Sequence, residues 1–229
     1  MKNIPIRSEA EIEKLRVACK LASDVLVMIE PHVKEGVTTG ELDRLCHQYI
    51  EEVQQGIPAC LGYHGFPKAT CISLNEVVCH GIPSHDKKLK KGDILNIDVT
   101  VIKDGYYGDN SKMYVVGEPN VKDKRLLEVT QESLYIALRT VKPGIRLNQI
   151  GKVIQQYVEK QGFSVVREYC GHGIGDQFHC DPQVLHYFSD DEGVILQEGM
   201  VFTIEPMVNA GKKEIRLMAD GWTVKTKDR

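Results

Sequence analysis

Hydrophobic and polar positions alternate with a helical period in two stretches near the start of the chain. Ser8 and Glu11 have the spacing of a capping box, and Pro31 predicts where the helix that they open should end. The apolar stripe of this helix comprises Ile12, Leu15, Ala18, Leu21, Ala22, Val25, Leu26 and Ile29. Residues 38–41 predict the start of a second helix, whose apolar positions are Leu42, Leu45, Cys46, Tyr49, Ile50 and Val53.

Residues 94–116 have the pattern of a β-hairpin instead. β-Branched and aromatic residues stand on both sides of Asp104-Gly105, and Asp-Gly is among the strongest short signals for a hairpin turn. A two-residue turn there places Asp98 opposite Ser111 and Thr100 opposite Asp109. Asp98 and Asp109 are then diagonal neighbours on one face of the ladder.

Two neighbouring carboxylates in an apolar hairpin repel each other and are costly to desolvate unless a positive charge lies between them. A divalent cation, or a pair of cations, is the natural occupant of such a place. Two plainer interpretations stay open at this point. Asp109 could flank a solvent-exposed turn, and Asp98 could pair with a lysine.

The pattern of the first half returns in the second half. Residues 33–37 recur as residues 141–145, at an offset of 108, and residues 92–98 match residues 199–205 at an offset of 107. A single deletion explains the change of offset. The chain is therefore predicted to be one domain, residues 1–229, built by internal duplication from two α-α-β halves at about 10–120 and 121–229. Glu205 becomes the twin of Asp98, and facing sheets would bring Asp98, Asp109 and Glu205 to one centre.

Composition limits the class of protein. The 229 residues are 42% hydrophobic and carry 29 lysines and arginines against 32 aspartates and glutamates, which is typical of a globular protein and not of a disordered or nucleic-acid-coating chain. No apolar run reaches the ~20 residues of a membrane span, and the N-terminus lacks the apolar core of a secretory signal. Seven cysteines without a CxxC pair argue against a disulfide framework. We expect a cytoplasmic protein.

His172 is the best candidate for a nitrogen ligand. It lies in Cys170-Gly-His-Gly-Ile-Gly175, where the glycines resemble a phosphate cradle, but the acidic residues that follow supply neither positive charge nor a helix N-terminus. Glycines on both sides of His172 would let the backbone approach a crowded centre. The alternative is a histidine in a flexible turn. Three carboxylates and one imidazole suit Mn, Fe, Co or Zn.

His80 and His179 both have apolar neighbours in the sequence. Each could be a satisfied core histidine, or, near a metal-bound water, a donor to a developing oxyanion. The remaining histidines are interpreted as surface or packing residues: His32, His47, His64, His85 and His186.

Whole blocks of sequence carry a resemblance to a known family. The blocks are CLGYHGFPKATCISLNEVVCHGIP, LNIDVTVIKDGYYGDNSKM, EYCGHGIG, FTIEPMVNAGKKEIR and DGWTVKTKDR. In order and content they resemble the bacterial type I methionine aminopeptidases, from about Ile12 to the last residue. The resemblance implies an α+β protein with the pita-bread fold, in which two pseudo-symmetric α-α-β halves surround antiparallel sheet. It also implies removal of the initiator methionine from nascent proteins whose second residue is small.

The resemblance also implies roles for particular residues. Asp98 would bind one metal, Asp109 would bridge two, and His172 and Glu205 would hold the other. Glu205 would also shuttle protons, and His80 and His179 would contact the substrate and stabilise its transition state. The methionine pocket would be lined by Cys60, Tyr63, Phe66, Cys71, Phe178 and Trp222. For Trp222 a plain core aromatic is the alternative.

The cofactor implied is a divalent metal, two ions per full-length subunit, drawn from Co, Mn, Fe, Zn or Ni. Members of the family carry a fifth ligand, a glutamate beyond the DGWTVKTKDR block, and this sequence stops inside that block; neither Glu214 nor Asp220 matches it. We therefore expect impaired activity and at most one tightly bound metal. The partners implied are nascent polypeptide N-termini and the ribosome near the tunnel exit, with a monomeric enzyme and no membrane. Two alternatives stay open: a proline-specific aminopeptidase of the same fold, and a non-catalytic peptide-binding module.

Overall fold

The computed structural model describes residues 4–228, which fall into two compact units. We call residues 13–123 and 216–225 the hairpin unit. We call the rest of the described chain, residues 4–12, 124–215 and 226–228, the α4 unit. Both contain helices and antiparallel sheet, in agreement with the predicted α+β class.

The hairpin unit is built on two long strands, β4 (Ile94–Lys103) and β5 (Tyr106–Val115), which pair antiparallel. The turn lies at Asp104-Gly105, where both residues have positive φ. Asp98 faces Ser111 and Thr100 faces Asp109, so the predicted register is confirmed. The short strands β1 (Ile57–Pro58) and β2 (Cys71–Leu74) pair with the other edge of β4.

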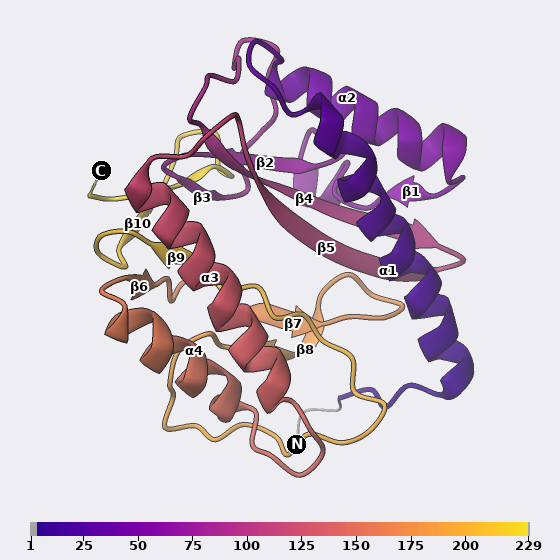
Figure 1. Ribbon diagram of the computed structural model, residues 1–229. Helices are drawn as coiled ribbons and strands as arrows, with labels where there is room; N and C mark the ends of the chain where they lie inside the picture. Colours follow the sequence, from indigo (N-terminus) through magenta and orange to yellow (C-terminus); the bar gives the residue numbers. More distant parts are fainter. Residues whose placement is uncertain (1–3, 229) are drawn as a thin grey trace. The chain divides into compact units, whose positions relative to one another are not determined.

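Helices α1 (Glu9–Ile29) and α2 (Thr39–Gln48) lie against the β4–β5 sheet (Figure 1). The capping box of α1 is confirmed, because Ser8 N donates to Glu11 Oε2 at 2.9 Å and Glu11 N donates to Ser8 Oγ at 3.4 Å. The buried side of α1 packs with the sheet in one apolar core that includes Val25, Ile29, Leu42, Leu95, Ile97 and Val99.

The helix after Thr38 also begins as predicted, with Thr38 Oγ1 accepting from Glu41 N at 3.1 Å. Its end differs from the prediction. A π-helical turn, Tyr49–Val53, follows α2, and Val53 is 65% exposed instead of lying on the apolar stripe. The wider turn rotates the last residues away from the face that the α-helical period would give them.

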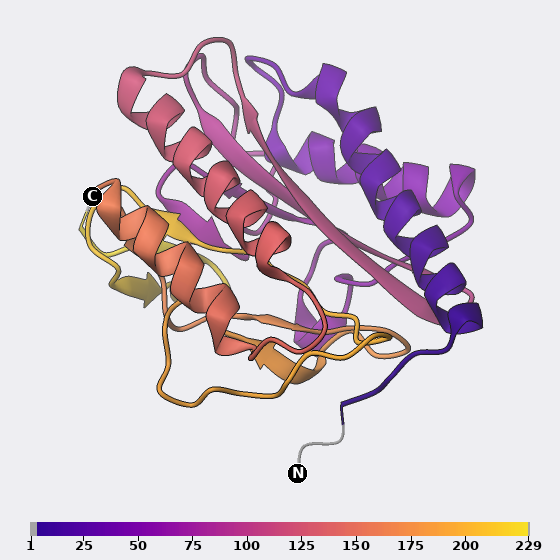
Figure 2. The same ribbon diagram turned by 60° about the horizontal axis from the view of Figure 1, so that its bottom comes forward.

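The α4 unit holds α3 (Val121–Thr140, apart from its first residues) and α4 (Asn148–Lys160), which run side by side in both ribbon views (Figures 1 and 2). Their shared core includes Val129, Ala137, Ile150, Ile154 and Val158. Two small antiparallel pairs complete the unit. They are β6 (Ser164–Val165) with β9 (Val208–Asn209), and β7 (Gly171–Gly173) with β8 (Cys180–Val184).

The strand predicted at residues 199–205, as the twin of β4, is absent as a continuous strand. Only an isolated bridge between Gly173 and Phe202 forms there. Pro206 directly follows Glu205 and has no N–H to continue a ladder. The segment is bonded to β7 at separate points, for example Thr203 N to His172 O at 2.8 Å.

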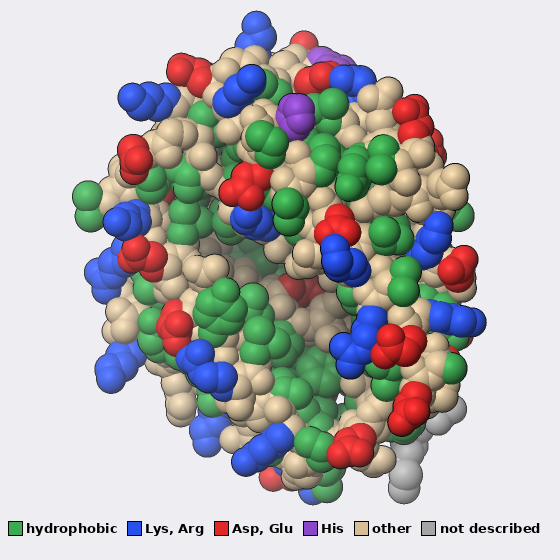
Figure 3. Space-filling model, turned by 45° about the vertical axis from the view of Figure 1, so that its right-hand side comes forward, with side chains coloured by type: hydrophobic (Ala, Val, Ile, Leu, Met, Phe, Trp, Pro, Cys, Tyr) green, Lys and Arg blue, Asp and Glu red, His purple; other side chains and the backbone are tan. Residues whose placement is uncertain are grey.

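A further antiparallel sheet joins β3 (Val77–Cys79), β10 (Ile215–Leu217) and β11 (Val224–Thr226) in the order β10-β11-β3. On the face drawn in Figure 3, basic and acidic side chains are interspersed without a single-sign field. Within residues 4–228, no helix has the length and apolar character needed to cross a membrane.

Candidate functional site

His172 occupies the middle of β7 between two glycines that the packing requires. A Cβ on Gly171 would lie 2.3 Å from Thr203 O, and a Cβ on Gly173 would lie 2.1 Å from Asp181 O. No side chain fits at either position. The interpretation of these glycines as places of close backbone approach is therefore confirmed.

His172 is buried, with 8% of the residue exposed, and the orientation of its imidazole is set by its own strand. Nδ1 lies 3.0 Å from Gly173 O. Because a carbonyl only accepts, Nδ1 carries the proton and Nε2 presents its lone pair. A backbone carbonyl on one ring nitrogen is the usual way in which a metal-binding histidine is oriented. His172 Nε2 lies 3.5 Å from Glu205 Oε1.

Thr203 connects His172 with Glu205. Its hydroxyl accepts from His172 N at 2.9 Å and donates to Glu205 Oε1 at 2.6 Å. Sequence reasoning missed Thr203. Its signal was the spacing of two residues from Glu205, which puts both side chains on one side of an extended chain.

His186 is the second residue that sequence reasoning missed, because it was grouped with surface and packing histidines. It is fully buried, and Nε2 accepts from Glu205 N at 3.0 Å. Burial lowers the pKa of His186 to about 3, so the ring is neutral near pH 7. No local pattern could have found it, since nineteen residues separate the two partners.

His179 lies close to His172 within the α4 unit. The two ring centroids are 4.1 Å apart, and Phe178 stacks on His179 with an interplanar angle of 26°. The loop before them is held by Asp176, whose Oδ1 lies 2.7 Å from Arg7 Nη2. The acidic residue in this loop thus has a specific cationic partner.

The hairpin unit contributes the aspartates. Asp98 on β4 faces Ser111 on β5 and Cys71 on β2. Asp109 on β5 accepts a hydrogen bond from Thr100 Oγ1 at 3.1 Å. Both are half-buried. A Cβ on the adjacent Gly108 would lie 2.1 Å from the backbone of Ala18, so glycine is needed where α1 crosses β5.

The residues predicted to bind methionine form two groups in the hairpin unit. A hydrogen bond to Cys60, followed by burial, raises the pKa of the Cys71 thiol, so this buried sulfur stays protonated and apolar. The rings of Phe66 and Trp222 pack edge to face, with centroids 5.1 Å apart, and the ring centroids of His80 and Trp222 are 6.2 Å apart. Burial lowers the pKa of His80. Phe178 and His179 belong to the α4 unit.

Candidate metal donors therefore occur in both units. Asp109 in the hairpin unit and His172 and Glu205 in the α4 unit offer carboxylate and imidazole donor atoms, and Asp98 adds another carboxylate. The fixed tautomer of His172 fits a metal ligand. Carboxylate and imidazole donors of this kind suit a borderline divalent ion.

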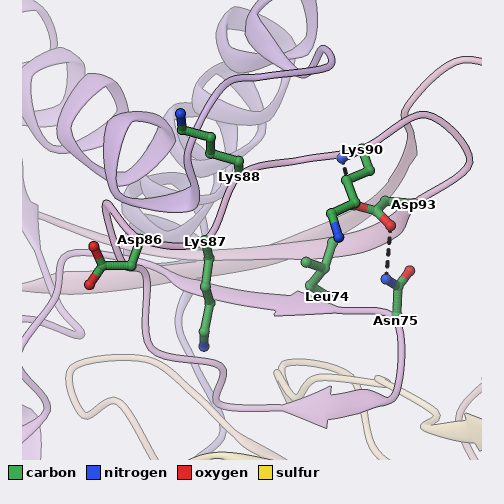
Figure 4. A pocket seen from close by; sticks show the side chains of 7 residues that line it. All are labelled: Leu74, Asn75, Asp86, Lys87, Lys88, Lys90 and Asp93. Carbon is green, nitrogen blue, oxygen red and sulfur yellow. Dashed lines mark hydrogen bonds between the residues drawn. The ribbon is translucent and has the colours of Figure 1, made fainter.

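A separate surface hollow of about 340 Å³ contains none of the predicted site residues (Figure 4). It is lined by Leu74, Asn75, Asp86, Lys87, Lys88, Lys90 and Asp93. Asp93 accepts hydrogen bonds from Asn75 Nδ2 at 2.9 Å and from Lys90 N at 2.7 Å.

Comparison with known proteins identifies the family. The model of metallopeptidase family M24 matches residues 13–227, and the chain belongs to that family. Within it, the chain groups with the bacterial methionine aminopeptidases and is a metal-dependent exopeptidase of that kind. It is 75% identical to a methionine aminopeptidase of Haemophilus influenzae over 99% of this chain and 85% of that protein. It is 67% identical to one of Escherichia coli over 99% of this chain and 86% of the relative.

Solved structures of similar proteins agree with this family assignment. The methionine aminopeptidase of Rickettsia prowazekii superposes with a TM-score of 0.96 at 52% identity, covering 99% of this chain and 91% of that one. A prolidase of Pyrococcus furiosus gives a TM-score of 0.74 at 26% identity, covering 88% of this chain and 57% of that one. The fold is the pita-bread fold, as predicted.

Proposed function

We propose that this chain removes the N-terminal methionine from nascent polypeptides whose second residue is small. The observation that carries the proposal is the 75% identity to a methionine aminopeptidase over 99% of the chain. A second observation supports it: His172 Nε2 and Glu205 Oε1, two candidate metal-binding atoms, lie 3.5 Å apart.

The residues proposed to hold the metal are Asp98, Asp109, His172 and Glu205. Their carboxylate and imidazole donors suit Mn, Fe, Co, Ni or Zn, and a centre of up to two such ions is proposed. When bound, such an ion acts as a Lewis acid that polarises a carbonyl and lowers the pKa of water.

Proton transfer and stabilisation of the developing negative charge are assigned to side chains of the protein. Glu205 is the proposed proton carrier; the hydroxyl of Thr203 holds its Oε1, which fixes the direction of the carboxylate. His179 and His80 are proposed to donate hydrogen bonds to the oxygen that becomes negative during attack. The lowered pKa of His80 favours a neutral ring, which can donate without adding a charge.

Specificity for methionine is proposed to come from Cys60, Tyr63, Phe66, Cys71, Phe178 and Trp222. Protonated thiols and aromatic edges make favourable contacts with an unbranched thioether. The first four of these positions and Trp222 belong to the hairpin unit.

The proposed setting is the cytoplasm, where the enzyme would meet new N-termini near the tunnel exit of the ribosome as a monomer. All seven cysteines are free thiols, which is compatible with a reducing compartment. The mixed surface charge of Figure 3 suits a soluble catalyst.

The experiment uses the metal-stripped protein reconstituted with Co²⁺ or Mn²⁺. A Met-Gly peptide should release free methionine, while the N-acetylated peptide should not, because an exopeptidase binds the free α-amine. A Leu-Gly peptide should be cleaved more slowly, by the ~1–3 kcal/mol that shape discrimination supplies. Glu205→Gln is the matched control and should be inactive.

Each alternative has its own outcome. Equal rates for methionine and leucine peptides would indicate a general aminopeptidase. Cleavage confined to Xaa-Pro peptides would indicate the proline-specific alternative. Metal binding without hydrolysis of any peptide would indicate a non-catalytic module.

A further inference from the structure

We propose that His186 and Thr203 are positioning residues that hold Glu205 by its backbone and by its carboxylate. The inference rests on the proposed function, because it gives these residues a purpose in a metal-dependent site. Neither residue was among the predicted ligands or substrate contacts.

The backbone of Glu205 lacks the support that a regular strand would give. Residues 203–207 are outside every strand, and Pro206 interrupts the donors directly after Glu205. A backbone N–H in such a segment needs an acceptor. The imidazole of His186 supplies it, with Glu205 N donating to Nε2 at 3.0 Å.

This bond determines the tautomer of His186. Because a backbone N–H only donates, Nε2 is the acceptor and the proton is on Nδ1. The ring is fully buried, and Nδ1 has no hydrogen-bond partner among the described residues. A buried donor without a partner is destabilising, so burial of this ring needs a reason beyond packing. Support of Glu205 is such a reason.

The segment that carries His186 is fastened to helix α4. A Cβ on Gly151 would lie 2.3 Å from Tyr187 O and 2.6 Å from Leu185 O, so the two backbones touch there. Asn148 Nδ2 donates to Ser189 O at 3.0 Å, and Gln155 Oε1 accepts from Phe188 N at 2.8 Å. His186 therefore presents Nε2 from a rigid support.

Thr203 acts on the side chain of Glu205. Its hydroxyl uses its one proton for Glu205 Oε1, at 2.6 Å, and accepts from His172 N, at 2.9 Å. The hydroxyl oxygen of Thr203 is therefore hydrogen-bonded to both candidate ligands of the α4 unit, to the backbone N–H of His172 and to the carboxylate of Glu205. Groups that orient metal ligands in this way commonly account for ~10–100-fold in metal affinity or activity.

The test compares matched variants. His186→Leu removes the acceptor, whereas His186→Gln places an amide oxygen at about the reach of Nε2. Co²⁺ affinity is measured by calorimetric titration of the metal-stripped protein, kcat and KM with a Met-Gly peptide, and Tm without metal. We expect His186→Leu to weaken Co²⁺ binding by ~10–100-fold and to lower kcat more than it raises KM. His186→Gln should restore most of both.

A second pair of variants, at Thr203, decides the question if His186→Leu does not fold. Thr203→Val removes both hydrogen bonds of the hydroxyl at nearly constant shape, and Thr203→Ser keeps them. Thr203→Val should lose Co²⁺ affinity and kcat, and Thr203→Ser should retain them.

Two results would overturn the inference while the proposed function stands: wild-type behaviour of His186→Leu and Thr203→Val, or equal losses in each variant and its conservative partner. A wild-type protein that binds Co²⁺ but cleaves no peptide contradicts the proposed function instead, and the affinity measurements still decide the positioning role.

Discussion

Arg7 and Asp176 form an ion pair in which Nη2 and Oδ1 are 2.7 Å apart and the side chain of Arg7 is only 7% exposed. The pair joins the segment before α1 to the loop that leads to Phe178 and His179. Gly175 allows this approach, because a Cβ there would lie 2.2 Å from the guanidinium.

Asp176→Asn should therefore destabilise the protein. The neutral amide removes one of two carboxylates that pair with the buried guanidinium, since Glu11 Oε1 also lies 3.2 Å from Arg7 Nη1. Asp176 itself is 56% exposed, so the expected loss is about 1 kcal/mol. Chemical denaturation measures it. Asp190→Asn, on an exposed loop residue, is the control and should leave the unfolding midpoint unchanged; an equally small effect of Asp176→Asn would show that the pair contributes nothing.

Glu11 should give the protein a specific acid sensitivity. Hydrogen bonds from Ser8, first from its backbone and then from its hydroxyl, together with one from Arg7, lower the pKa of Glu11 to about 2. A lowered folded-state pKa gives stability that is present above the unfolded value, near 4.5, and is lost as the pH falls towards 2. Thermal unfolding of Glu11→Gln should thus depend less on pH than the wild type between 4.5 and 2. Parallel curves for the two proteins would contradict the assignment.

Asp109→Ala should abolish metal-dependent peptidase activity, because this residue is the proposed bridging ligand. Hydrolysis of a Met-Gly peptide and elemental analysis of metal content measure the effect. Asp104→Ala, at the hairpin turn, is the control for the same strand pair. Near-normal turnover by Asp109→Ala would remove the aspartate from the metal site.

His179→Ala should lower turnover by ~10²-fold or more and leave metal content unchanged, as expected for a side chain that stabilises developing charge without binding metal. Phe178→Leu separates this effect from the loss of the stacked ring and should retain more activity. If the metal were lost together with activity, His179 would have to be counted as a ligand.

Local chemistry let the sequence determine much of this protein. The turn at Asp104-Gly105 determines the register that pairs Asp98 with Ser111, because a two-residue turn leaves one alignment of the arms. The capping box likewise sets the start of α1. Whole motif blocks then identified the family, and with it the fold.

Only the tertiary structure decided how the candidate ligands of the α4 unit, His172 and Glu205, are supported. The repeat predicted a strand around Glu205, but Pro206 prevents a continuous ladder, and the N–H of Glu205 turns to a side chain instead. That side chain, His186, stands nineteen residues away in an apolar segment, where nothing local separates it from a packing residue. A hydrogen bond between distant positions depends on how α4 places the intervening chain, and no period or spacing in the sequence records it.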